Sequence, residues 1–342
     1  MPPPSTVPPT HVPKPSVRPK VWNPPSDTGL TGPYERNQAL ASAEVWPVPG
    51  EGPEDVVLTE DGTLYTGTVD GSIFEITAAG NRIHRVATTG GRPLGIELLG
   101  DGRLLVCDAD RGLLAIDPGT GAMQELVTTV DGIALKCTNN ATVGPDGTIW
   151  FTDSSRRFPV HHYKGDLIEH SGTGRLFRRD PDGDVHTLLD GLHFANGVTL
   201  DPQGQFVLIA ETGTYSITRL WLQGPKQGTT DQFAQMPAFP DNLSTGPGGT
   251  IWCAAASDRN KLLDSLLSKP PLLRTLVWNL PDALQPAPAT MALVFGYDRE
   301  GTLTHNLQWH DGPFIVATGA REHDGHLYVG SLTSPSILRY RL

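Results

Sequence analysis

Short hydrophobic runs recur along the chain from about residue 43, and each is separated from a second β-rich run by a turn that contains glycine. In the first unit, residues 56–58 precede the turn 60–62, and residues 63–65 follow it. Another strand-like segment follows each unit, so the pattern predicts six units of about four strands. The turn glycines of the six units are Gly62, Gly102, Gly147, Gly204, Gly249 and Gly325.

The spacing of these glycines predicts an all-β fold, a six-bladed β-propeller. It lies near or above the roughly 40 to 50 residues per blade that are typical of propellers, and the excess is assigned to loop insertions. The last unit lacks an outer strand before Leu342, and we expect residues 43–48 to supply it and close the ring. The predicted domains are a proline-rich N-terminal arm (1–42) and the propeller (43–342). The longest insertion, 258–290, contains one predicted helix, 261–267.

Composition and charge narrow the classes of partner. The net charge of −11, with no Lys/Arg-rich run, argues against nucleic acid and against anionic membrane surfaces as partners. No stretch approaches the roughly 18 apolar residues of a membrane span, and the first 25 residues are proline-rich and do not resemble an export signal. Cys107, Cys137 and Cys253 are expected to be buried thiols, which favours a cytoplasmic location.

One register of the repeat carries candidate chemistry. The residues eight positions before the six turn glycines are Glu54, Leu94, Asn139, Asn196, Asp241 and Ala317. The first strand of each blade lines the central channel, so residues of equal register are expected to converge at one depth. Four of these six side chains offer oxygen atoms and none is a thiol or imidazole, a set that suits Ca²⁺. The alternative is that they cap strand ends or bind channel water.

Several motifs resemble a known superfamily of six-bladed calcium propellers, which includes gluconolactonase (senescence marker protein), diisopropyl fluorophosphatase and paraoxonase. Within it the chain is most similar to the strictosidine synthase-like branch, particularly the adipocyte plasma membrane-associated protein type. The motifs are GPEDV (52–56), GRPLGI (91–96), FTDSS (151–155), LLDGLHFANGV (188–198), VLIAET (207–212), MPAFPDN (236–242) and EHDGHLYVGS (322–331).

The resemblance implies a calcium site with the ligands Glu54, Asn139, Asn196 and Asp241, and with Asn242 as a fifth candidate. Relatives carry Asp at the position of Asn140, where paraoxonase holds a second calcium, so the asparagine weakens the case for a second ion. Paraoxonase-like enzymes have a histidine where this chain has Leu94, so their histidine-assisted mechanism does not transfer.

Three residues are candidates for catalysis. Asp241 would orient or deprotonate water or attack the substrate, and His193, three residues before Asn196, would shuttle protons. Glu322 matches the glutamate with which strictosidine synthase condenses an amine and an aldehyde, but it stands three residues before its turn glycine instead of eight.

The expected function is hydrolysis of a small-molecule lactone or carboxylic ester, with Ca²⁺ in the channel as Lewis acid. Two alternatives stay open: a non-enzymatic interaction scaffold with a structural calcium, and a condensing enzyme of the strictosidine synthase type. The natural substrate and the oligomeric state do not follow from the sequence.

Overall fold

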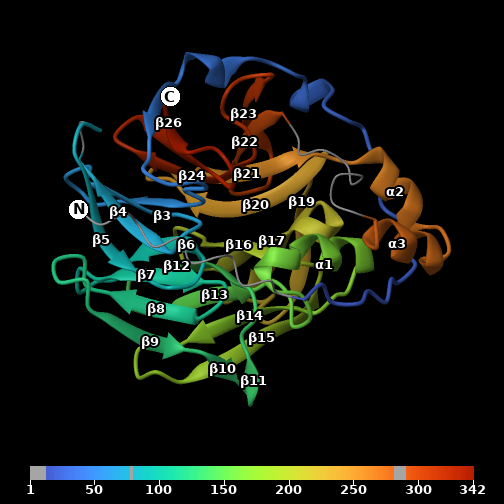
Figure 1. Ribbon diagram of the computed structural model, residues 1–342, viewed down its shortest axis with the longest axis horizontal. Helices are drawn as coiled ribbons and strands as arrows, with labels where there is room; N and C mark the ends of the chain where they lie inside the picture. Colours follow the sequence, from blue (N-terminus) through green and yellow to red (C-terminus); the bar gives the residue numbers. More distant parts are fainter. Residues whose placement is uncertain (1–12, 78–79, 281–289) are drawn as a thin grey trace.

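Six four-stranded antiparallel sheets stand in a ring in the computed structural model, which describes residues 13–77, 80–280 and 290–342 (Figure 1). The predicted six-bladed β-propeller is confirmed. Blades 1 to 3 comprise β2 (Val56–Leu58), β3 (Leu64–Gly67), β4 (Ser72–Ile76) and β5 (Ile83–Thr88); β6 (Pro93–Leu98), β7 (Leu104–Asp108), β8 (Gly112–Ile116) and β9 (Met123–Val127); and β12 (Thr138–Val143), β13 (Ile149–Asp153), β14 (Gly174–Arg179) and β15 (Val185–Leu192). Blades 4 to 6 comprise β16 (Ala195–Leu200), β17 (Phe206–Glu211), β18 (Ser216–Trp221) and β19 (Thr230–Gln235); β20 (Ala238–Thr245), β21 (Ile251–Asp258), β22 (Met291–Tyr297) and β23 (Leu303–His310); and β24 (Ala317–His323), β25 (His326–Ser331), β26 (Ser336–Arg341) and β1 (Glu44–Pro47). A hairpin, β10 (Thr129–Val130) and β11 (Ile133–Ala134), joins blades 2 and 3.

The N-terminal strand closes the ring as predicted. Strand β1 pairs antiparallel with β26, the last strand of the chain, and so completes blade 6. Glu44 and Arg339 are opposite each other in this pair and their side chains are 3.2 Å apart. Trp46 packs edge-on against Tyr328 at a centroid distance of 5.7 Å. Closure by strands from the two ends of the chain makes the sixth blade depend on contacts distant in sequence.

A separate hydrophobic core fills each of the six gaps between neighbouring blades. Between blades 2 and 3, for example, Leu105 and Cys107 pack with Phe151 and Phe177. Both faces of each sheet are therefore covered, which explains why second strands such as β7 (LLVCD) and β17 (FVLIAE) are nearly continuous hydrophobic runs. Cys107, Cys137 and Cys253 are buried free thiols, as expected.

The two faces of the ring differ. The inner strand of each blade begins at the face that we call the loop face, where Thr138 pairs with Asp153 and Ala238 pairs with Asp258. The long connections after Asp153 and Asp258 therefore emerge there. The glycine turns that join the first and second strands lie at the opposite end, which we call the turn face.

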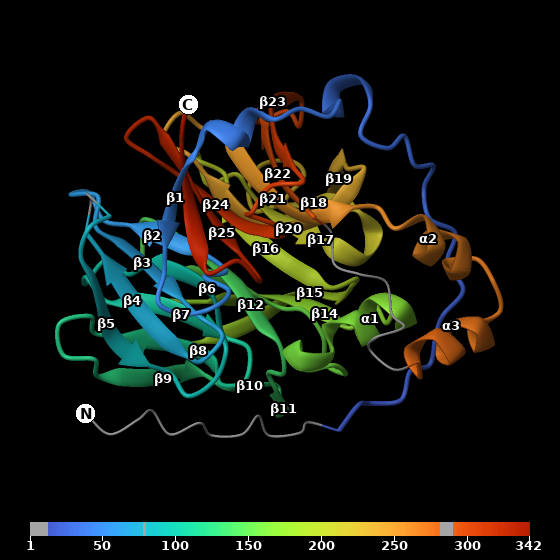
Figure 2. The same cartoon turned by 45° about the horizontal axis from the view of Figure 1, so that its top comes forward.

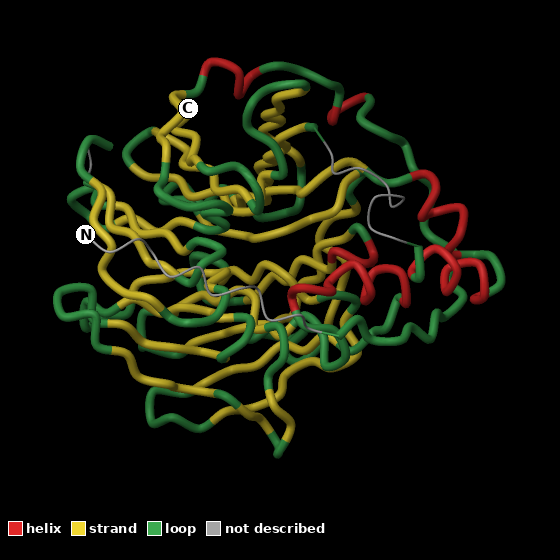
Figure 3. Tube along the Cα trace, in the orientation of Figure 1, coloured by secondary structure: helices red, strands yellow, loops and turns green. Residues whose placement is uncertain are grey.

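A cap of helices covers part of the loop face (Figures 1 and 3). It contains α1 (Tyr163–Glu169), α2 (Lys261–Leu267) and α3 (Pro271–Trp278), of which only α2 is predicted from the sequence. Residues 13–25 lie against the cap: the Trp22 N–H donates to the carbonyl of Leu267 (3.0 Å), and the Trp278 indole donates to that of Pro15 (2.8 Å) (Figure 2). The remaining helices are the 3₁₀ turns η1 (Gly32–Tyr34), η2 (Ala39–Ser42), η3 (Val160–His162) and η4 (Thr212–Thr214).

Two parts of the sequence-based predictions fall outside the described residues: the first twelve residues of the arm, and residues 281–289 of the long insertion. No helix in the described part of the chain is long and apolar enough to cross a membrane.

Candidate functional site

A β-bulge marks the start of the inner strand in five blades. In blade 3, Thr138 pairs with Asp153 but Ala141 pairs with Phe151, so one extra residue is inserted opposite the second strand. The same shift occurs in blades 2, 4, 5 and 6. A bulge bends a strand and redirects its side chains. Here one residue per blade no longer follows the alternation of side chains between the two faces of the sheet. We call the six residues at the first bulge position, with Glu54 at the matching position of blade 1, the channel ring.

The predicted register is correct in blades 1 to 5 and wrong by one residue in blade 6. There the shift lies between Ala317 and Ala320, so Thr318 and not Ala317 occupies the channel ring. The cause is a shorter hairpin: His323 pairs with His326 across residues 324–325, whereas blade 3 uses residues 144–148. The channel ring therefore consists of Glu54, Leu94, Asn139, Asn196, Asp241 and Thr318.

Two hydroxyl groups fix how the ring asparagines point. The Asn139 amide nitrogen donates to Ser154 Oγ (3.0 Å), and this hydroxyl donates its own proton to the carbonyl of Ala195 (2.8 Å). The Asn196 amide nitrogen likewise meets Thr212 Oγ1 (3.2 Å), which donates to the carbonyl of Pro240 (2.7 Å). A hydroxyl has one proton, so each of these must accept from the asparagine, and the amide oxygen is left to point away.

Four buried oxygens of this region have no hydrogen-bond donor in the described structure: Glu54 Oε2, Asn139 Oδ1, Asn196 Oδ1 and Asn242 Oδ1. The residues that carry them are at most 4% exposed. Asn242 is joined to the ring because its amide nitrogen donates to Glu54 Oε1 (2.9 Å). Buried acceptors are almost always paired, so four unpaired ones together call for a bound group that offers positive charge.

The electrostatics of the ring also favour a cation. Burial raises the pKa of Glu54 well above its usual range, and the nearby carboxylates of Asp241 and Asp55 raise it further, against a smaller opposing effect of Arg92. Burial raises the pKa of Asp241 to about 8, although a hydrogen bond from Asn196 partly offsets this effect. Two buried carboxylates cannot both ionise at low cost unless a positive charge lies between them.

The donor set fits Ca²⁺. It consists of carboxylate and amide oxygens, which are the ligands of a hard cation with six to eight oxygen neighbours. The described residues contain no cluster of three or more His, Cys, Asp or Glu side chains that could hold a metal. Any metal here would therefore depend on the asparagine oxygens, which excludes a site of the zinc type.

A second polar layer lies next to the ring and is fully paired. Asp55 accepts hydrogen bonds from the backbone of Val56 and Ile96 and from the Asn140 amide (2.9, 3.3 and 3.2 Å). The amide oxygen of Asn140 accepts from the Val198 N–H (2.9 Å). These bonds join blades 1 to 4 across the axis. Asn140 is therefore bonded to protein groups through both its nitrogen and its oxygen, and the layer holds the strands together.

The other catalytic candidates are not part of the ring. His193 lies at the start of blade 4, where its ring stacks on His170 at 3.9 Å, and burial lowers its pKa. Glu322 lies near the turn face, where its carboxylate accepts from the Trp252 indole (2.8 Å). Four residues of strand separate Glu322 from the ring residue Thr318, about 13 Å at 3.3 Å per residue.

Three residues near the ring were not assigned to it from the sequence, although Ser154 and Thr212 lie in the motifs FTDSS and VLIAET. Ser154 and Thr212 are the first residues after the second strands of blades 3 and 4, so a hydroxyl residue at that register was the available signal. Tyr163 begins α1. Burial raises the pKa of Tyr163, and the nearby Asp241 carboxylate raises it further. Its place next to blade 4, with its ring 6.3 Å from that of Phe194, depends on how the cap folds back.

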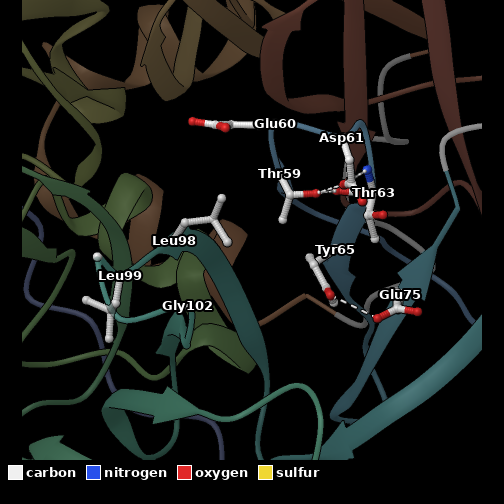
Figure 4. Close-up of a pocket in the computed structure, with 10 residues that line it drawn as sticks. Thr59, Glu60, Asp61, Thr63, Tyr65, Glu75, Leu98, Leu99 and Gly102 are labelled. Carbon is white, nitrogen blue, oxygen red and sulfur yellow. Dashed lines mark hydrogen bonds between the residues drawn. The ribbon is translucent and has the colours of Figure 1, made fainter.

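Two shallow depressions lie on the turn face, away from the ring. The larger, of about 700 Å³, lies between the first turns of blades 1 and 2 (Figure 4). Apart from Glu60, its polar side chains are paired with one another: the Tyr65 hydroxyl donates to Glu75 (2.9 Å), and Asp61 accepts from Thr59 and Thr63 (2.5 and 3.1 Å). It offers no convergent reactive groups, so the ring is the candidate site.

Comparisons with known proteins agree with this architecture. The strictosidine synthase family matches residues 139–225, and the N-terminal region of strictosidine synthase-like proteins matches residues 32–76. The adipocyte plasma membrane-associated protein of Rattus norvegicus is 34% identical over 317 residues, which cover 85% of this chain and 83% of that protein. Protein STRICTOSIDINE SYNTHASE-LIKE 6 of Arabidopsis thaliana is 33% identical over 309 residues, which cover 85% and 79%.

Solved structures share the fold at low sequence identity. A gluconolactonase from Xanthomonas campestris superposes with a TM-score of 0.64 at 19% identity and covers 97% of this chain and 99% of its own. A calcium-binding regucalcin from Agrobacterium tumefaciens gives a TM-score of 0.60 at 15% identity and covers 86% and 90%. Sequence identity above 30% over most of the chain is decisive for ancestry, and this chain belongs to the strictosidine synthase-like family.

Proposed function

We propose that this protein is a calcium-dependent hydrolase of small lactones or carboxylic esters, with its site at the channel ring. The observation that carries the proposal is the group of unpaired buried oxygens on Glu54, Asn139, Asn196 and Asn242. Folding leaves such acceptors without donors at a cost of about 1–3 kcal/mol each unless a ligand compensates. The gluconolactonase and regucalcin propellers that share the fold support the same interpretation.

Each residue of the site would have its own role in metal binding or proton transfer. Glu54, Asn139, Asn196 and Asp241 would hold Ca²⁺, with Asn242 as a fifth ligand. A bound Ca²⁺ supplies Lewis acidity that polarises a substrate carbonyl and stabilises developing negative charge. Asp241 would orient or deprotonate water or attack the carbonyl, and Asn196 would keep its carboxylate in place. His193, neutral near pH 7 because burial lowers its pKa, would receive a proton at the loop face.

Condensation of an amine with an aldehyde is not supported by the position of its candidate residue. Glu322 is bound to Trp252 near the turn face and is separated from the ring by the length of β24. We therefore keep Glu322 out of the proposed mechanism. The buried free thiols support our proposal of a reducing compartment such as the cytoplasm.

The decisive experiment combines metal binding with turnover. The full chain is stripped with EGTA and titrated with CaCl₂ or MgCl₂ by calorimetry, and hydrolysis of phenyl acetate and of an aliphatic δ-lactone is followed by pH-stat. We expect one Ca²⁺ to bind more tightly than Mg²⁺ and turnover to appear only with Ca²⁺. Turnover that survives exhaustive chelation would contradict the proposal. Tight calcium binding without turnover of any ester or lactone would instead support the scaffold alternative.

A further inference from the structure

Helices α2 and α3 of the cap expose leucine side chains to solvent. Leu272 and Leu276 of α3 are 66% and 59% exposed, Leu262 of α2 is 54% exposed, and Leu273 is 41% exposed. We call these four residues the leucine face. The two helices project from the edge of the molecule in both views (Figures 1 and 2). Large apolar side chains grouped on one surface usually mark an interaction site.

The orientation of α3 is fixed with this face outward. A surface helix normally buries its apolar stripe and exposes its charges, but α3 buries Arg274 together with Trp278, one turn later. The Arg274 guanidinium donates to the carbonyls of Ile168 (2.8 Å) and Lys20 (2.5 Å), which ties α3 to α1 and to the N-terminal segment. The leucines cannot turn inward without breaking these buried bonds.

The charge around the leucine face is opposite to that of the whole chain. Residues 13–22 and 261–280 contain six Lys or Arg residues and one acidic residue, although the chain carries −11. The single acidic residue, Asp264, is already bonded to Arg259 (2.9 Å) and Tyr215 (2.7 Å). Lys261 begins α2 and Lys269 lies between α2 and α3, so these two exposed cations flank the leucines along the chain, and Arg18 and Lys20 of the N-terminal segment are also exposed. This corner therefore combines an apolar face with a basic rim.

We propose that the α2–α3 corner docks on an anionic lipid surface, with the leucine face in the interface and the basic rim at the headgroups. Helices that lie in a membrane interface show this combination of outward leucines and flanking Lys or Arg. A basic rim complements acidic lipids, because cations near such a surface are attracted to its negative potential. A second copy of this chain is a poorer match, because in a two-fold contact the basic rim would face the same basic rim. The inference does not depend on the proposed hydrolase activity.

The test is sedimentation of the full chain with vesicles of phosphatidylcholine, with or without about one-third phosphatidylserine, in the presence of EGTA. We expect binding to the anionic vesicles that weakens with salt and is at least ten-fold weaker to the neutral ones. Leu272→Ser with Leu276→Ser, and separately Lys261→Glu with Lys269→Glu, should each lower the binding at least ten-fold. The matched control is Val45→Ser with Ile83→Ser, which removes two exposed apolar side chains from β1 and β5, far from α3 in both views, and should leave binding unchanged.

Three outcomes would overturn the proposal. The first is a wild-type chain that does not bind anionic vesicles. The second is equal loss of binding in the leucine and control variants. The third is self-association, measured by analytical ultracentrifugation, that the leucine variant abolishes while vesicles are not bound, which would assign the face to a second copy. Unchanged melting temperatures of the variants establish that a loss of binding is not a loss of fold.

Discussion

The two ends of the inner strands differ in whether their buried oxygen atoms have hydrogen-bond donors. At the loop face, Glu54, Asn139 and Asn196 each leave an oxygen without a donor from the residues that the structure describes. At the turn face, buried Asp201 accepts from both Arg299 Nε and Nη2 (2.7 and 3.1 Å), and Glu322 accepts from Trp252 (2.8 Å). The inner strands thus lead from unpaired oxygens at the channel ring to these paired carboxylates at the turn face. The difference indicates that the turn face contributes to stability and the loop face to binding.

The largest expected effect contrasts two identical substitutions at the two ends. Glu54→Gln removes a charge from the ring and should lower kcat/KM at least about 100-fold, roughly 3 kcal/mol of transition-state stabilisation, and weaken Ca²⁺ binding in parallel. Glu322→Gln, near the turn face, should change kcat/KM less than about two-fold. Initial rates and calcium calorimetry on both variants check this. Comparable losses in both would remove the functional distinction between the two ends.

The second prediction concerns the free energy of unfolding, for which the larger loss is expected at the turn face. Asp201→Asn breaks a buried carboxylate pair whose partner Arg299 is partly exposed, and should lower the free energy of unfolding by about 2 kcal/mol. Asp241→Asn should leave the metal-free protein equally stable or more stable, because burial already raises the pKa of Asp241. Urea unfolding in EGTA measures both. A metal-free Asp241→Asn protein that is less stable than the Asp201→Asn protein would contradict the comparison.

A pH effect of intermediate size is expected in the cap. Burial lowers the pKa of His170 from its ordinary value near 6.5 to about 3, with smaller contributions from His193, Arg274 and Lys20. The neutral imidazole is therefore the stable form in the folded protein. The neutral imidazole contributes on the order of 2 kcal/mol to the free energy of unfolding above about pH 6.5, and this contribution is lost as the pH falls toward 3.

Unfolding midpoints of the wild type and His170→Asn between pH 7 and pH 4 test this expectation. Asparagine suits the left-handed backbone at this position, where φ is 56°. The variant should lose less stability on acidification than the wild type. Parallel pH profiles would show that another group causes any acid sensitivity of the cap.

The smallest expected effect follows from removing a hydroxyl group that orients a ring asparagine. Thr212→Val removes the group that accepts from Asn196 and should weaken Ca²⁺ binding about ten-fold, roughly 1.4 kcal/mol. Thr212→Ser keeps the hydroxyl and should restore most of the affinity. Calorimetry on the pair separates orientation from packing, because a purely packing role would not be rescued by the smaller serine.

Much of the architecture could be predicted from the sequence because it depends on local patterns. Hydrophobic runs separated by glycine turns predicted six blades, and closure by residues 43–48 is confirmed by the pairing of β1 with β26. The register eight residues before each turn glycine selected Glu54, Asn139, Asn196 and Asp241, because in blades 1 to 5 the inner strand ends four residues before the turn glycine. In blade 6 the shorter hairpin shifted that register by one residue.

The sequence by itself determined which residue types stand at the start of each inner strand, because alternation and turn spacing are local properties of the chain. Only the tertiary structure decided which oxygens stay unpaired. Whether Asn140 or Asn139 has a free oxygen depends on donors from other blades: Val198 satisfies Asn140, whereas Ser154 takes only the amide nitrogen of Asn139. The leucine face has the same origin, since the bonds of Arg274 to distant carbonyls determine which side of α3 meets solvent.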